Sequence, residues 1–168
     1  SKTWMRPETA PNERTFQRHE DTAMKYFEHL SLEELWTRTL QEIDHLYARA
    51  ERTEEGLPAT ERNALLQSLA ILRNDGPLVD GAEGHMSCIG AMLRDALDRE
   101  TLGVRNVFDG RDDPDLGSIG TIRQIPVLSE KGRAVDRLLR DFLMISAMRV
   151  LLMARVDANR QMVCLKAS

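Results

Sequence analysis

The chain has 168 residues, of which 42% are hydrophobic and 30% are charged, so one folded domain is expected without a metal or a disulfide to stabilise it. Its formal net charge of −4 argues against nucleic-acid binding over the whole surface. Its two cysteines, Cys88 and Cys164, argue against a disulfide scaffold and favour a reducing, cytoplasmic setting.

The first 19 residues are polar, contain Pro7 and Pro11, and include no apolar run of the kind found in signal peptides. We interpret residues 1–19 as an extended arm and residues 20–168 as a single helical domain. The simpler account of this arm, which we favour, is a disordered tail. The alternative is that Trp4 inserts into a groove on a partner subunit, because an isolated tryptophan gains much free energy on burial.

Apolar residues at helical spacing predict four helices in the next part of the chain. The clearest begins at Ser31, which forms an S-x-x-E capping box with Glu34 and precedes an apolar stripe that runs to Ala50. Breaks at the TEEGLPAT and NDGP segments delimit the others. The four predicted helices cover residues 20–30, 31–50, 60–73 and 81–101.

Glycine, proline and β-branched residues characterise residues 103–128. The pieces VRNVF and TIRQIPV predict two short strands, over 104–108 and 120–128, within a long loop. The second is expected at a sheet edge, because Pro126 has no N–H to donate. The tail segment 160–166 contains a short apolar run and is interpreted as a third strand.

A long helix is predicted over residues 129–157, and its second half is apolar on nearly every face. This apolar run is too short to cross a bilayer and contains Arg149, which argues against a membrane span. Such a helix is either wrapped by other helices or buried against a second copy. The second option predicts a homodimer interface that comprises Trp4, Leu143, Met144, Met148, Leu151 and Leu152.

These elements predict a mainly α fold of about five helices packed around a long apolar C-terminal helix, with a small two- or three-stranded β element. The chain contains no nucleophile elbow, P-loop, dinucleotide-binding or HExxH motif. Its eight methionines suit adaptable apolar surfaces. The favoured function is therefore a non-enzymatic, homodimeric interaction or regulatory domain that binds a protein partner and needs no cofactor.

The stretch GAEGHMSCIGAM, residues 81–92, supports an alternative function. His85 and Cys88 share one helical face, and His45 is a candidate third ligand, so this stretch could anchor a ligand or a metal. The competing interpretation is structural: its small residues allow close packing against the last helix, with Cys88 buried. We favour packing and predict no metal.

An uneven distribution of charge supports a second alternative. Residues 75–118 contain ten acidic and four basic residues, whereas residues 129–168 contain eight basic and four acidic. Arg133, Arg137 and Arg140 lie along one helical stripe, which could bind phosphates in a nucleic-acid-binding regulator. The same stripe could instead contact the acidic segment of this chain or of a partner.

Overall fold

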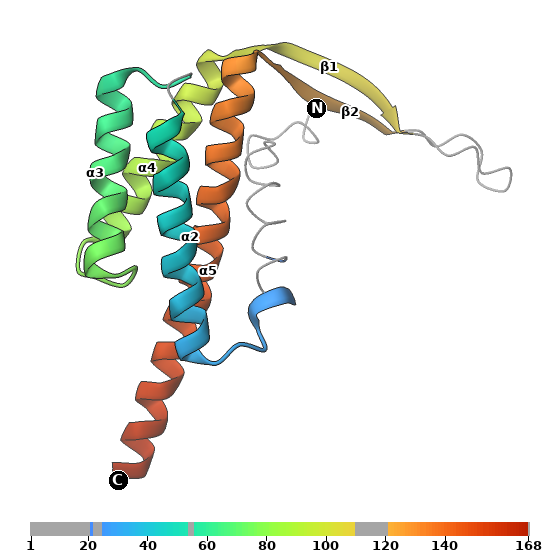
Figure 1. Ribbon diagram of the computed structural model, residues 1–168. Helices are drawn as coiled ribbons and strands as arrows, with labels where there is room; N and C mark the ends of the chain where they lie inside the picture. The colour runs from blue at the N-terminus through green and yellow to red at the C-terminus, as the bar shows by residue number, and fades with distance from the viewer. Residues whose placement is uncertain (1–20, 22–24, 54–55, 110–120, 168) are drawn as a thin grey trace, which may run out of the picture.

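The computed structural model describes residue 21 and residues 25–53, 56–109 and 121–167 (Figure 1). It confirms the mainly α fold with a long C-terminal helix and a small β element. Trp4 and the predicted arm lie outside the described residues. The elements are α2 (Leu32–Arg52), α3 (Ala59–Asp75), α4 (Ala82–Arg99), β1 (Thr101–Asp109), β2 (Thr121–Leu128) and α5 (Glu130–Ala167).

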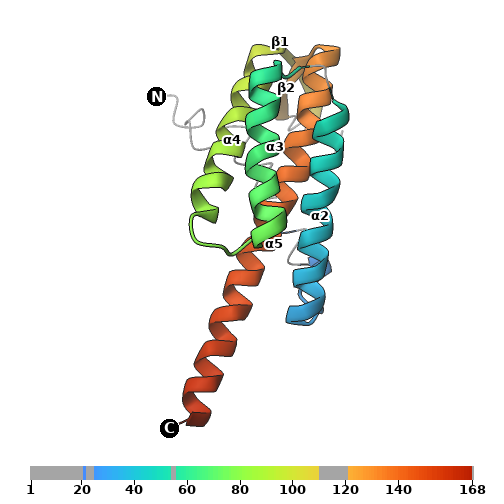
Figure 2. The same cartoon turned by 60° about the vertical axis from the view of Figure 1, so that its left-hand side comes forward.

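Helices α2 to α5 form an up-down-up-down bundle (Figures 1 and 2). Helix α3 packs between α2 and α4, and α5 packs against both α2 and α4 on the other side. Helices α2 and α4 therefore occupy opposite corners of the bundle. One hydrogen bond of the capping box predicted for α2 is present: the backbone N–H of Glu34 donates to the hydroxyl of the N-cap residue Ser31 at 3.1 Å.

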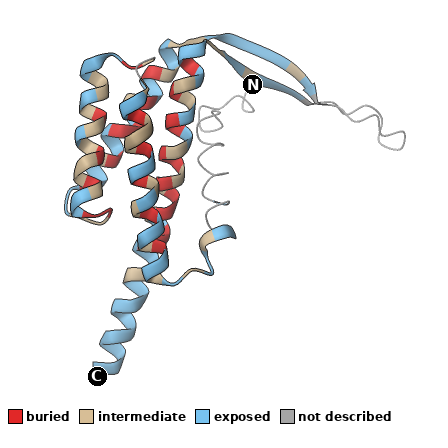
Figure 3. Ribbon diagram, in the orientation of Figure 1, coloured by how far each residue is buried: buried red, intermediate tan, exposed pale blue. Residues whose placement is uncertain are grey.

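The apolar half of α5 lies in the core of this single chain, as the buried residues in Figure 3 show. Leucines and isoleucines of the other three helices cover α5 from Val135 to Ile145. Leu35 of α2 packs against the part of α5 from Ala147 to Leu152. The one buried polar side chain among the described residues, Thr39, donates its hydroxyl to the Leu35 carbonyl at 2.7 Å. The bundle thus satisfies the requirement that an all-round apolar helix be buried.

This burial changes how the predicted interface residues are interpreted. Leu143, Met148, Leu151 and Leu152 are at most 7% exposed, and Met144 is partly buried against the same core. Their cover comes from other parts of the same chain. The apolar character of α5 is therefore explained without a second copy, and any association surface must be sought elsewhere on the molecule.

An arginine–carboxylate ion pair crosses each of the four neighbouring helix pairs. Such exposed pairs each contribute at most about 1 kcal/mol, but together they favour one arrangement of the helices. In the α3–α4 pair, the hydrogen bond from Arg99 to Glu61 raises the pKa of the guanidinium above its ordinary value. The pairs are Arg49–Asp141 (2.8 Å), Arg73–Asp44 (3.4 Å), Arg99–Glu61 (2.6 Å) and Arg149–Glu83 (3.5 Å).

The two predicted strands are confirmed, and together they form the connection between α4 and α5. They pair antiparallel, with Val104 opposite Pro126 and Phe108 opposite Ile122, and the hairpin projects from one end of the bundle (Figure 1). The predicted third strand, 160–166, is wrong, because these residues continue α5. No glycine or proline follows Gly132 in this helix, so nothing ends it at 157.

Candidate functional site

The three residues proposed for a ligand or metal site do not converge. His85 is partly exposed and Cys88 is exposed on α4, whereas His45 is exposed on α2, at the opposite corner of the bundle. In the described part of the chain, no group of three or more histidine, cysteine, aspartate or glutamate side chains could hold a metal ion. The geometry therefore offers no support to the ligand-sensing or metal-binding alternative.

The glycine-rich start of α4 brings backbone close to α5 at one position. A Cβ atom on Gly90 would lie 3.1 Å from Cε2 of Phe142, whereas a Cβ atom on Gly84 would meet nothing within 4 Å. The packing interpretation is thus confirmed for Gly90 and does not extend to Gly84. The prediction that Cys88 is buried is wrong, because its side chain faces solvent.

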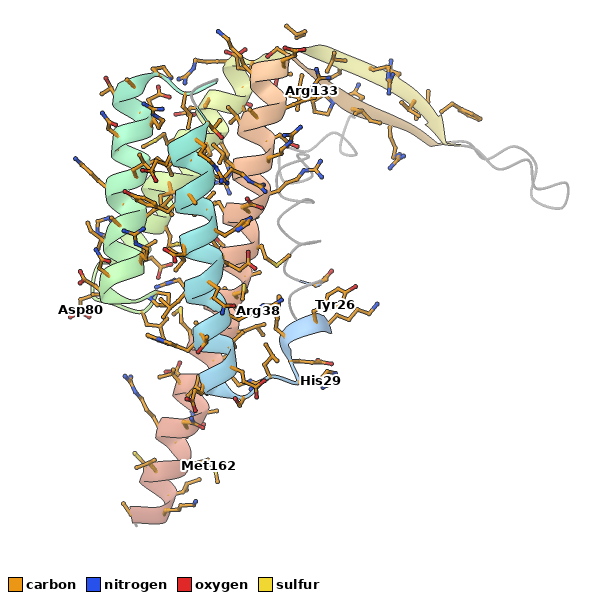
Figure 4. All side chains as sticks on the ribbon, viewed as in Figure 1. Tyr26, His29, Arg38, Asp80, Arg133 and Met162 are labelled. Atoms are coloured by element: carbon orange, nitrogen blue, oxygen red, sulfur yellow. The ribbon has the colours of Figure 1, made fainter. Side chains whose placement is uncertain are left out.

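Two hollows in the described surface bear on the ligand-binding alternative. The one beside Gly90 has a volume of about 230 Å³ and is lined in part by Arg94 and Arg149, but by neither His85 nor Cys88. It is smaller than most sites for organic ligands. A wider hollow of about 650 Å³ lies between residues 26–30 and the first half of α2, and its described lining includes no histidine or cysteine. Figure 4 labels Tyr26 and Arg38, which belong to this lining.

The predicted arginine stripe is exposed along the first half of α5. Arg140 donates to the Asp136 carboxylate at 2.9 Å, and Arg133 lies 3.9 Å from the Glu130 carboxylate. Two of the three guanidinium groups are thus shared with carboxylates of the same helix, which lowers the positive potential available to a phosphate. The stripe does not form a concentrated cationic surface.

Exposed apolar side chains gather on one face of the hairpin. Side chains alternate between the two faces of a strand, so the antiparallel register places Val104, Phe108 and Ile122 on the same face. Their side chains are 59%, 65% and 68% exposed. Figure 3 shows the hairpin almost entirely exposed beyond the end of the bundle.

A second group of exposed apolar side chains lies at the opposite end of the molecule, where α5 extends past the bundle (Figures 3 and 4). Every residue from Asp157 to Ala167 is exposed. An apolar stripe nevertheless continues along this end from the buried Leu151, at steps of three and four residues. The stripe consists of Leu151, Ala154, Ala158, Met162 and Leu165.

Arg155 marks the place where α5 leaves the bundle. Its guanidinium donates hydrogen bonds to the backbone carbonyl of Leu30, at 2.5 Å, and to that of Glu28, both in the segment before α2. The projecting end of α5 is therefore anchored at its base.

Sequence reasoning identified neither projecting surface as a site. The alternating pieces VRNVF and TIRQIPV located the strands, but did not show that the hairpin would stand clear of the helices. Among the described residues, no helix has the length and hydropathy required to cross a membrane. Comparisons with protein-family models, curated proteins and solved structures found no match to this chain.

Proposed function

We propose that this protein is a non-enzymatic, homodimeric interaction domain that presents the projecting end of α5 to a protein partner. The observation that carries the proposal is the apolar stripe of α5, which begins as part of the core at Leu151 and continues past the last helix that covers it. Ala158 and Met162 extend this stripe into solvent.

A helix end of this length is only marginally stable in water by itself, because most helical stability in proteins comes from packing one apolar face. The stripe supplies such a face. Recognition of an amphipathic helix by an apolar groove relies on side chains at this spacing, and the small Ala154 and Ala158 would let the groove approach the backbone closely.

Charge indicates the chemistry of the partner. Residues 153–167 include three basic side chains and one acidic side chain, so this end of α5 is positively charged. A complementary groove would have an apolar floor and an acidic rim, because opposite charges at the rim speed association and fix orientation.

Two matched substitutions test the partner. Met162→Glu places a charge on the stripe, whereas Val163→Glu makes the same kind of change at the next residue, on a different face of the helix. The full chain should capture a protein that Val163→Glu also captures and Met162→Glu does not. With that protein purified, Met162→Glu should weaken binding about tenfold or more in calorimetry, as expected from losing one buried methionine. Equal affinity of the two variants would contradict the proposal.

The homodimeric part is tested separately by light scattering of the full chain over a range of concentrations. We expect the mass of two chains. The support for it is the exposed apolar face of the hairpin, since a lone two-stranded hairpin is marginally stable in water. A mass of one chain at every concentration would contradict the homodimer. It would not affect the proposal that the end of α5 binds a partner, which the substitutions at Met162 and Val163 test.

A further inference from the structure

We propose that the hollow between α4 and the middle of α5 binds a phosphate group, either as inorganic phosphate or as part of a small phosphate monoester. Its volume of about 230 Å³ is too small for most organic ligands, but it leaves room for one oxyanion and a few water molecules. The hollow is lined by residues of α4 and α5 within the bundle. This inference is therefore independent of the proposed function, which concerns the hairpin and the projecting end of α5.

Two contacts between α4 and α5 fix how the walls of the hollow face each other. A Cβ atom on Gly90 would lie 3.1 Å from the Phe142 ring, and the Arg149 guanidinium lies 3.5 Å from the Glu83 carboxylate. The helices are antiparallel neighbours (Figures 1 and 2), and the two contacts lie about two turns apart on each helix. The groove between the helices thus has one contact at each end.

Two serines lie between these contacts and line the hollow from its two sides. Ser87 is one turn before Gly90 on α4, and Ser146 is one turn before Arg149 on α5. Because the helices are antiparallel, the two serines lie at about the same level, across the groove from each other. Neither hydroxyl has a hydrogen-bond partner among the described residues. Each wall therefore offers the hollow a hydroxyl donor.

Arg94 supplies a positive charge at the Gly90 end of the hollow. Long side chains of a helix point back toward its N-terminus, which for Arg94 is the direction of Gly90. Nη1 of Arg94 lies 3.7 Å from the position that a Cβ atom on Gly90 would occupy, so the guanidinium lies beside the space that this glycine leaves. In the described part of the chain no carboxylate pairs with Arg94, unlike the arginines that join the helix pairs of the bundle.

Arg149 supplies a second positive charge at the other end. Its side chain is only 12% exposed, and its Nε donates to the Pro77 carbonyl at 2.9 Å, so the guanidinium is already held in place. Such preorganisation lowers the entropy cost of binding a ligand. The distance of 3.5 Å to the Glu83 carboxylate is longer than a charge-assisted hydrogen bond, and the Glu83 side chain is 80% exposed. Glu83 can therefore turn outward and leave Nη1 of Arg149 to an anion.

These donors together favour a phosphate group over a carboxylate. The described lining of the hollow includes two guanidinium groups and one carboxylate, so its charge is positive. A tetrahedral phosphate directs oxygens toward donors on opposite walls, whereas a planar carboxylate suits a single guanidinium fork. The two serine hydroxyls and the two arginines, contributed by two helices, match the first geometry.

Calorimetric titration of the full chain with inorganic phosphate tests the site. The ionic strength is held constant with chloride, because salt screens exposed charges. The wild type should bind phosphate saturably, and acetate should bind about tenfold more weakly or less. Methyl phosphate distinguishes the two sources of the phosphate group. Tighter binding than that of inorganic phosphate would assign the hollow to an ester, and weaker binding would assign it to the free ion.

Three substitutions identify the residues that bind the anion. Arg94→Gln should weaken phosphate binding about tenfold or more, because it removes a charge-assisted hydrogen bond. Arg137→Gln is the matched control, since it removes the same charge from an exposed arginine of α5 that does not line the hollow. Glu83→Gln should tighten binding about two- to fivefold, because it removes the carboxylate that competes for Arg149.

Thermal unfolding supplies a second measurement and shows that each variant folds. Phosphate stabilises many proteins through exclusion from their surface, so the two arginine variants are compared at one phosphate concentration. Phosphate should raise the Tm of Arg94→Gln less than that of Arg137→Gln. The proposal would be overturned if the wild type showed no saturable binding, or if the two arginine variants bound phosphate equally well. Weaker binding by Glu83→Gln would also overturn it.

Discussion

The hydroxyl of Ser129 donates a hydrogen bond to the Glu100 carboxylate at 2.8 Å, and the backbone N–H of Ser129 donates to the Glu100 carbonyl at 3.1 Å. Glu100 ends α4 and Ser129 precedes α5, so this pair joins the two ends of the hairpin at the end of the bundle. The hydroxyl also accepts the N–H of Gly132 at 3.0 Å. The base of the hairpin is therefore fixed to the helices although its strands project away from them.

Ser129→Ala should destabilise the protein by about 1 kcal/mol, because it removes the side-chain cap of α5. Ser31→Ala is the matched control, since Ser31 caps α2 far from the hairpin. Urea unfolding should give similar losses for the two variants. Amide exchange of β1 and β2 should accelerate in Ser129→Ala alone. Unchanged exchange in the hairpin of Ser129→Ala would show that this pair does not hold it.

The two glycines of α4 should respond in opposite directions to larger side chains. Gly84→Ala should raise the free energy of unfolding by about 0.5–1 kcal/mol, because its Cβ meets open space and alanine favours the helix. Gly90→Leu should lower it by about 1–3 kcal/mol, because the new side chain must displace the Phe142 ring. Chemical denaturation checks both. A gain in stability at Gly90 would show that the contact between α4 and α5 is loose.

Much of this fold follows from periodic patterns that a single sequence displays. The apolar stripe of α2, with Ser31 before it, required only local chemistry to interpret, and it predicted both the helix and its start. The segment 160–166 suggests a strand although it is helical, because a short apolar run fits a strand or a helix equally well. The segment is helical because it continues α5, which has no glycine or proline after Gly132 to end it before Ala167.

The candidate surfaces were harder to predict because exposure depends on tertiary packing. The apolar character of residues 142–154 predicts that they are buried, but does not say by what. Residues of α2, of the segment before it and of the turn before α4 proved sufficient to cover Met148 and its neighbours. Conversely, Phe108 and Met162 belong to ordinary apolar patterns, and only the arrangement of the bundle shows that they lie outside it.

Met148→Ala distinguishes a core residue from an interface residue. Met148 is fully buried within one chain, so its truncation should lower the free energy of unfolding by about 2–5 kcal/mol. Met153→Ala, in the same helix but 39% exposed, should cost far less. Light scattering should give the same mass for both variants as for the wild type. Loss of the dimer in Met148→Ala, with little change in the free energy of unfolding, would show that Met148 contributes to an interface between subunits.

Hydrogen exchange along α5 should separate its two halves. Amides between Val135 and Leu152 lie in the core and should exchange slowly, whereas those from Asp157 to Ala167 should exchange rapidly, because no described helix packs against that end. Dimerisation through the hairpin should slow exchange in β1 and β2 without affecting the end of α5, since the two lie at opposite ends of the bundle (Figure 1). Only the protein partner should protect residues 157–167. Slow exchange there in the purified chain would mean that a second copy already covers the stripe, and it would move the homodimer contact from the hairpin to α5.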